Sequence, residues 1–216
     1  MLRRAFIIAV PTTFALLLMP ATGTSSSLAE RWHTCVDEPL QAERDLRNEA
    51  DKKEPVTYRL VLICRYSGPN KKLPGHAFVI LGEYDDKAKV CKEDGLYGLY
   101  AKSDLQGAMS YFIGKAPGTV MESPKDRDLN LSVHRLDLVI GKAQHGRVTK
   151  VIDEWTKKAK EGNVYKAGDQ DCVTFTRAVA EALHDSGLAT LDRKTNELPV
   201  EYLRRLVEAN LPKQKK

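Results

Sequence analysis

A long apolar run constrains the fold more than any other stretch of this 216-residue chain. Residues 56–66 read Val-Thr-Tyr-Arg-Leu-Val-Leu-Ile-Cys-Arg-Tyr, which is rich in β-branched and aromatic side chains. Such residues favour strands, and a nearly continuous apolar run is typical of a strand that is covered on both faces. We therefore expect a central, well-buried strand here, with the rest of the fold arranged around it.

Three further strands are expected, at 76–82, within 88–100 and within 129–138. Turn-rich segments at 67–75 and 85–87 separate the first three strands, so these should form an antiparallel meander. Apolar residues at helical spacing predict helices at about 143–160, 172–186 and 199–210, whereas 102–126 is expected to be a loop with one helical turn at 108–112. The pattern indicates the α+β class, with a small antiparallel sheet packed against helices.

The N-terminus has the pattern of a cleaved signal peptide. Arg3 and Arg4 precede an apolar stretch at 5–19, and small residues follow up to a predicted cleavage site near Ala29, with Gly23 as an alternative. The apolar stretch is shorter than the roughly 20 residues of a spanning helix, so an uncleaved anchor is the less favoured reading. We expect a periplasmic or secreted protein without a stable membrane span after signal removal.

The rest of the chain divides into a charged arm at 30–55, a single domain at 56–211 and a disordered basic tail at 212–216. The net charge is only +5, of which Arg3 and Arg4 supply two, and this argues against nucleic-acid binding. The cysteines lack zinc-site spacing, so neither a metal nor a cofactor is expected. In an oxidising compartment the predicted disulfide is Cys35–Cys91, with Cys64 as a buried thiol.

Cys172 is the candidate nucleophile. It should lie in the first turn of a helix that Asp169 or Asp171 can cap, where unpaired backbone N–H groups favour a thiolate. His76, which opens the predicted strand at 76–82, is the candidate base that takes the thiol proton. The alternative interpretation is a core cysteine, with a histidine that simply bonds a turn carbonyl.

A third polar group should orient the imidazole of a Cys–His pair. If the predicted strands at 76–82 and 88–100 form a hairpin around Asp86, a residue near Asp94 or Tyr97 would face His76. Asp94 is the predicted orienting residue, and His134 is its competitor.

Three segments carry a family resemblance: Gly-His-Ala-Phe at 75–78, Gly-Leu-Tyr-Gly-Leu-Tyr at 95–100 and Asp-Cys-Val-Thr-Phe at 171–175. They resemble the circularly permuted papain-like cysteine hydrolases, the permuted branch of the NlpC superfamily that includes lecithin–retinol acyltransferase-like proteins. The resemblance covers roughly residues 56–188. It implies a permuted papain-like fold, Cys172 as nucleophile, His76 as base, and hydrolysis or transfer at an amide, ester or thioester. Asp171 stands where an asparagine is common, and its carboxylate would oppose thiolate formation.

We therefore expect an exported cysteine hydrolase that acts on an amide or peptide bond through the Cys172–His76 pair. By analogy, the candidate substrate is the peptide of cell-wall peptidoglycan. Two alternatives stay open. One is a non-catalytic binding protein on the same scaffold. The other is an acyltransferase or lipid-modifying enzyme at a membrane surface, for which residues 108–113 offer the apolar patch.

Overall fold

The computed structural model describes residues 43–67, 73–85, 90–122 and 132–211. The predicted signal peptide, the first half of the predicted arm (residues 30–42) and the basic tail lie outside these ranges. The predicted Cys35–Cys91 disulfide lies outside them too, because Cys35 is not described and only the backbone of Cys91 is.

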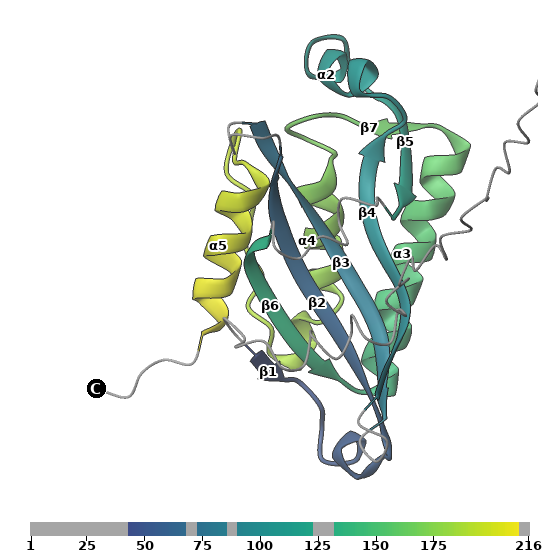
Figure 1. Cartoon of the computed structure of the whole chain (residues 1–216), viewed down its shortest axis with the longest axis vertical. Helices are drawn as coiled ribbons and strands as arrows, with labels where there is room; N and C mark the ends of the chain where they lie inside the picture. The colour runs from purple at the N-terminus through teal and green to yellow at the C-terminus, as the bar shows by residue number, and fades with distance from the viewer. Residues whose placement is uncertain (1–42, 68–72, 86–89, 123–131, 212–216) are drawn as a thin grey trace, which may run out of the picture.

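The described chain forms a seven-stranded sheet in the order β1-β6-β2-β3-β4-β5-β7 (Figure 1). At its centre β2 (Val56–Ser67) lies between β6 (Ser132–Ile140) and β3 (Leu73–Asp85), and β4 (Val90–Ala101) continues the antiparallel meander. The ends of the sheet are β1 (Glu43–Asp45), which runs parallel to β6, and the pair β5 (Ala116–Met121) and β7 (Asn163–Tyr165). The predicted α+β class and the predicted central strand are confirmed.

Three helices cover one face of this sheet: α3 (Lys142–Glu161), α4 (Cys172–Glu181) and α5 (Pro199–Asn210). The short helix α2 (Asp104–Ile113) stands apart at the end where β4 and β5 meet (Figure 1). Single 3-10 turns lie at η1 (Asp51–Lys53) and η4 (His184–Ser186). In the part of the chain that the structure describes, no helix is both long and apolar enough to span a membrane.

Successive residues of the central strands face opposite sides of the sheet, as strand geometry requires. On β3, Ala77 and Val79 belong to the core beneath the helices, whereas Phe78 and Ile80 belong to a second cluster on the other face. The members of this opposite-face cluster are Val61, Ile63, Phe78, Ile80, Tyr84 and Leu96. This alternation decides which side chains of β3 can meet α4.

Two elements differ from expectation. The predicted loop contains strand β5, which the sequence did not indicate because Pro117 and Gly118 are typical of turns. Strand β7 pairs with β5 only at residues 116 and 117, and the register shifts between them. Proline is tolerated at such an irregular position of a sheet. The predicted turn at 108–112 is the longer helix α2, because the Ser103 hydroxyl accepts from the Gln106 amide at 3.2 Å and caps its start.

Candidate functional site

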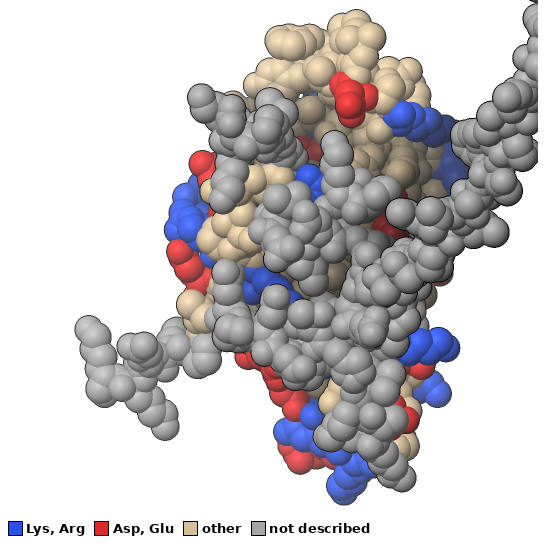
Figure 2. Space-filling model, in the orientation of Figure 1, with Lys and Arg blue, Asp and Glu red and all other residues tan. Residues whose placement is uncertain are grey.

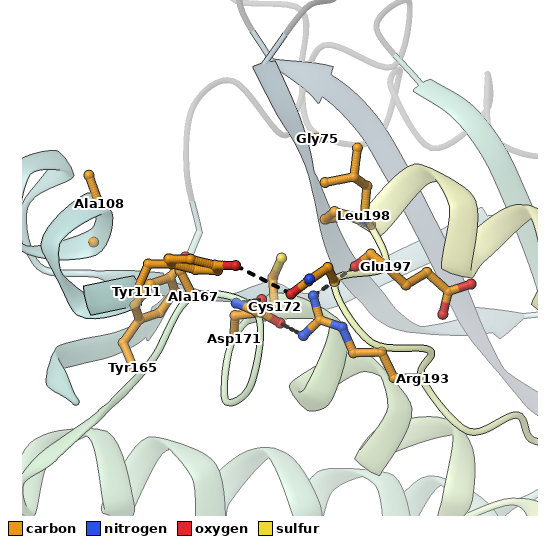
Figure 3. Close-up of a pocket in the computed structure, with 14 residues that line it drawn as sticks. Gly75, Ala108, Tyr111, Tyr165, Ala167, Asp171, Cys172, Arg193, Glu197 and Leu198 are labelled. Atoms are coloured by element: carbon orange, nitrogen blue, oxygen red, sulfur yellow. Dashed lines mark hydrogen bonds and ion pairs between the residues drawn. The ribbon is translucent and has the colours of Figure 1, made fainter. Parts of the chain in front are cut away.

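A pocket of about 440 Å³ opens at the start of α4 (Figure 3). Its walls come from α2, from the segment between β7 and α4, and from the segment that leads into α5. The side chains that matter below are Tyr111, Tyr165, Asp171, Cys172, Arg193 and Asn196. Residues far apart in the sequence therefore converge on the first turn of α4.

Cys172 is the first residue of α4, as predicted, and its side chain lines the pocket while only 5% of the residue is exposed. Asp171 caps the helix: its Oδ1 accepts from the Val173 amide at 3.0 Å and its Oδ2 accepts from the Gly168 amide at 2.9 Å. Cys172 and the apolar residues behind it hold this end of α4 against the sheet. The site is therefore built on a firmly capped helix.

The thiol of Cys172 is protonated at neutral pH. Burial raises the pKa of Cys172 to about 12, and the neighbouring Asp171 carboxylate adds to the rise. Hydrogen bonds from the backbone amides of Ala77 and Val173, together with the Arg193 charge, act in the opposite direction. The Ala77 contact brings the sulfur against β3, one residue from His76.

The imidazole of His76 lies on the other face of β3. Its ring stacks on Tyr100 with ring centroids 4.0 Å apart, and on Phe78 of the opposite-face cluster at 5.9 Å. Burial, with a smaller effect of Arg65, lowers the pKa of His76 to about 3, so the ring is neutral. The structure thus places the Cys172 sulfur beside the backbone next to His76 but turns the imidazole away from it.

Gly98 makes room for this imidazole. A Cβ atom added at Gly98 would lie 2.5 Å from His76 Nε2, closer than real side chains approach. The segment 95–100, which carried part of the family resemblance, therefore contacts the His76 ring through Gly98 and Tyr100.

The structure does not bring Asp94 to His76. Pairing of β3 with β4 joins Val79 to Tyr97 and Leu81 to Gly95, and its register shifts beyond Leu81. Asp94 therefore lies near Leu81, well along the strand from His76, while the residue beside the imidazole is Tyr100. The hairpin aligns several residues away from the alignment that the sequence suggested. The Asp94 side chain itself is outside the described atoms.

His134, the competing candidate, faces α5. It lies on β6 opposite Cys64, and its pKa is lowered by burial and then by Arg204, with Glu208 acting in the other direction. Both charged residues belong to α5. Cys64 is a buried free thiol, as expected.

An ion pair that the sequence reasoning missed forms one wall of the pocket. Arg193 Nη1 donates to Asp171 Oδ1 at 2.7 Å, and Arg193 Nη2 donates to the Glu197 carbonyl at 2.8 Å (Figure 3). The Tyr111 hydroxyl donates to Asn196 Oδ1 at 3.4 Å, and both residues line the pocket. No local pattern marks these partners, because they come from separate segments.

Comparison of the chain with protein-family models, with curated proteins and with solved structures gives no significant match.

Proposed function

We propose that the chain is an exported cysteine hydrolase of the permuted papain-like class, which cleaves an amide or peptide bond with Cys172 as nucleophile. The observation that supports this most is the position of the sulfur. Cys172 opens α4 at the pocket, and its sulfur receives a hydrogen bond from the amide of Ala77, the neighbour of His76. An acyl group in the pocket would meet a thiol with backbone N–H groups around it.

The proposed reaction needs only the groups of this chain and water. His76 accepts the proton of the Cys172 thiol, and the sulfur attacks the carbonyl carbon. Backbone N–H groups at the start of α4 stabilise the oxyanion. The imidazolium returns its proton to the leaving amine as the C–N bond breaks. Water then hydrolyses the thioester, which releases the acid and restores the thiol.

Catalysis requires one rearrangement. The imidazole stacks on Tyr100 on the face of β3 opposite the Cys172 sulfur. The backbone of β3 must therefore change at His76 when substrate enters, because rotation of the side chain alone does not bring the ring to the sulfur. Catalytic hydrogen bonds often become short only in the substrate complex. The buried ring is neutral but a weak base, because burial lowers the pKa of His76 to about 3. The same rearrangement must therefore move the ring into a more polar environment, which raises its pKa toward neutrality.

Matched variants test the proposal. Purified parent protein should release amine from synthetic cell-wall peptides, Cys172→Ala should abolish this activity, and His76→Gln should lower kcat/KM by at least about a hundredfold. Cys64→Ala serves as the control, because Cys64 is also a buried free thiol among the described residues and is not part of the pocket lining. Cleavage by Cys172→Ala at the parent rate would refute the proposal.

The second candidate is a non-catalytic binding protein on the same scaffold. It is favoured by the protonated thiol of Cys172 and by the imidazole that faces the opposite cluster. In that case iodoacetamide at neutral pH should label the parent no more than Cys172→Ala. A ligand found by thermal-shift screening should bind both proteins equally well.

The acyltransferase alternative retains one supporting observation, the exposed apolar surface of α2. Leu105, Phe112 and Ile113 are 70%, 83% and 74% exposed, and the same helix lines the pocket through Tyr111. Figure 2 shows mainly uncharged side chains at this end of the molecule. Sedimentation with phospholipid vesicles separates this alternative from the other two, which predict no vesicle binding.

A further inference from the structure

We propose that Arg193 is a positioning residue of the Cys172 site: it holds the Asp171 carboxylate in its capping geometry and cancels the charge that this carboxylate presents to the sulfur. The inference rests on the proposed function, because it concerns how Cys172 becomes able to act as a nucleophile. It also answers the objection that an aspartate beside the nucleophile opposes thiolate formation.

The geometry around Asp171 leaves little freedom. Its Oδ1 accepts from both the Val173 amide and Arg193 Nη1, at 3.0 and 2.7 Å, while its Oδ2 accepts from the Gly168 amide at 2.9 Å. A carboxylate bound by a guanidinium and two amides is held in one position. Arg193 therefore connects the segment before α5 to the first turn of α4.

Arg193 is itself held in place. Its Nη2 donates to the Glu197 carbonyl at 2.8 Å, and the Glu197 carboxylate accepts from Arg205 Nη1 at 2.5 Å and from the Lys194 amide at 3.0 Å. The Glu197 side chain is only 3% exposed. The guanidinium is therefore anchored from α5 and is not a mobile surface charge.

The charges act strongly because the pair is shielded from water. The side chains of Arg193 and Asp171 are 12% and 8% exposed. Asp171 raises the pKa of Cys172 and Arg193 lowers it, both acting beside the larger effect of burial. Removal of Arg193 alone would leave a buried carboxylate next to the sulfur without its counter-ion.

Other titratable groups near the sulfur carry less weight at neutral pH. Tyr165 of β7 is uncharged there, since burial raises the pKa of its phenol. His76 beyond the Ala77 amide is also neutral. Among the described residues that line the pocket, the charged side chains are Asp171, Arg193 and Glu197.

Thiol alkylation tests the proposal without any substrate. The rate of carbamidomethylation of Cys172 by iodoacetamide is followed from pH 7 to 9 by peptide-resolved mass spectrometry, with circular dichroism to verify folding. Arg193→Gln should slow the reaction about tenfold at each pH, equivalent to a rise of about one pKa unit. Asp171→Asn should accelerate it. The double variant should return to within about threefold of the parent, because both charges are gone.

Arg193→Lys distinguishes the electrostatic role from a purely structural one, since lysine keeps the charge but loses the fork geometry. Its rate should lie between those of the parent and Arg193→Gln. If Arg193→Gln does not fold, the alkylation rates of Arg193→Lys and of the double variant are compared with the parent instead, because neither variant leaves an unpaired buried carboxylate. Equal rates in the parent and in folded Arg193→Gln, or equal slowing by lysine and glutamine, would overturn the inference. Cleavage by Cys172→Ala would refute the hydrolase proposal instead and leave this comparison intact.

Discussion

At the scale of single residues, Gly98 and His76 meet on the sheet face opposite α4. A Cβ at Gly98 would lie 2.5 Å from His76 Nε2, so Gly98→Ala must displace the ring or the strand. We expect a loss of about 1–3 kcal/mol in the free energy of unfolding, measured by urea denaturation. Gly146→Ala is the matched control: it has open space in α3 and should stabilise the protein by about 0.5–1 kcal/mol. Equal stability of Gly98→Ala and the parent would contradict this packing.

The buried His76 should make stability depend on pH. Its pKa is about 3 in the folded protein and 6.5 in the unfolded chain, so between these values the unfolded state binds more protons. Stability is therefore complete above pH 6.5 and falls as the pH is lowered toward 3, by up to about 1.4 kcal/mol per pH unit. Between pH 7 and pH 5 the loss of stability in urea unfolding should be about 2 kcal/mol smaller in His76→Gln than in the parent, while His134, whose pKa is also lowered, keeps its own contribution in both proteins. The exposed His184, replaced by glutamine, should leave the loss unchanged.

The role of a residue could be predicted where it depends on neighbours in the sequence. It could not be predicted where it depends on how strands and helices pack against one another. The position of Cys172 and the capping role of Asp171 follow from local helix signals. The facing of His76 depends on which face of β3 the helices cover, and the distance of Asp94 from His76 depends on how β4 aligns with β3, where the register shifts beyond Leu81. Arg193 was missed because its partner Asp171 lies in a separate segment.

At the scale of elements, Ser110 connects α2 to the segment before α4. Its hydroxyl donates to the Gly107 carbonyl at 2.7 Å and accepts from the Ala167 amide at 3.0 Å, and Ser110 is the buried residue of this helix. Ser110→Ala leaves the Ala167 amide without this acceptor, which should cost about 1–3 kcal/mol locally. Hydrogen exchange should accelerate at 104–113 and at Ala167.

The control for this prediction is Ser186→Ala, which removes a hydroxyl that accepts from Arg147 at the far end of α4. Exchange in α2 should not respond to it. Unchanged exchange in Ser110→Ala would show that α2 is held by other contacts, and that the pocket mouth does not depend on this serine.

Elements with a clear apolar period were predictable nearly to their ends. The helix expected at 199–210 is α5, Pro199–Asn210, because proline suits the first turn and the apolar stripe is continuous. The strand expected at 76–82 extends over Leu73–Asp85, since pairing with β2 carries it into a turn-like sequence. The short strands β1 and β7 have too few residues for any period to appear.

At the scale of the whole molecule, the sheet separates the two candidate catalytic residues. Its helix-side core contains Cys172, and its other face carries the His76 ring against Phe78. The meander of β2, β3 and β4 was predictable, because short turns join neighbouring strands. The pairing of β6 with β2 could not be predicted, because it joins segments about seventy residues apart and no local sequence pattern indicates it.

Because β2 lies at the centre of the sheet, weakening it should destabilise the sheet and the helices together. Leu62 of β2 is fully buried and pairs with Val79 of β3 and Leu136 of β6. Leu62→Ala should lower the free energy of unfolding by about 2–5 kcal/mol. Trp32 is first replaced by phenylalanine, so that the emission comes from Trp155, which packs beneath the sheet against Phe175. The shift should then be the same by far-ultraviolet circular dichroism and by this fluorescence.

Leu105→Ala is the control for Leu62, because Leu105 on α2 is 70% exposed and its loss should change stability by less than about 0.5 kcal/mol. Coincident transitions in Leu62→Ala would show that the helices and the sheet unfold globally as one unit. Separate transitions for the two probes would mean that α3 keeps its packing when the centre of the sheet is weakened. The rearrangement of β3 at His76 that the proposed function needs would then be a local opening of the sheet and would not require global unfolding.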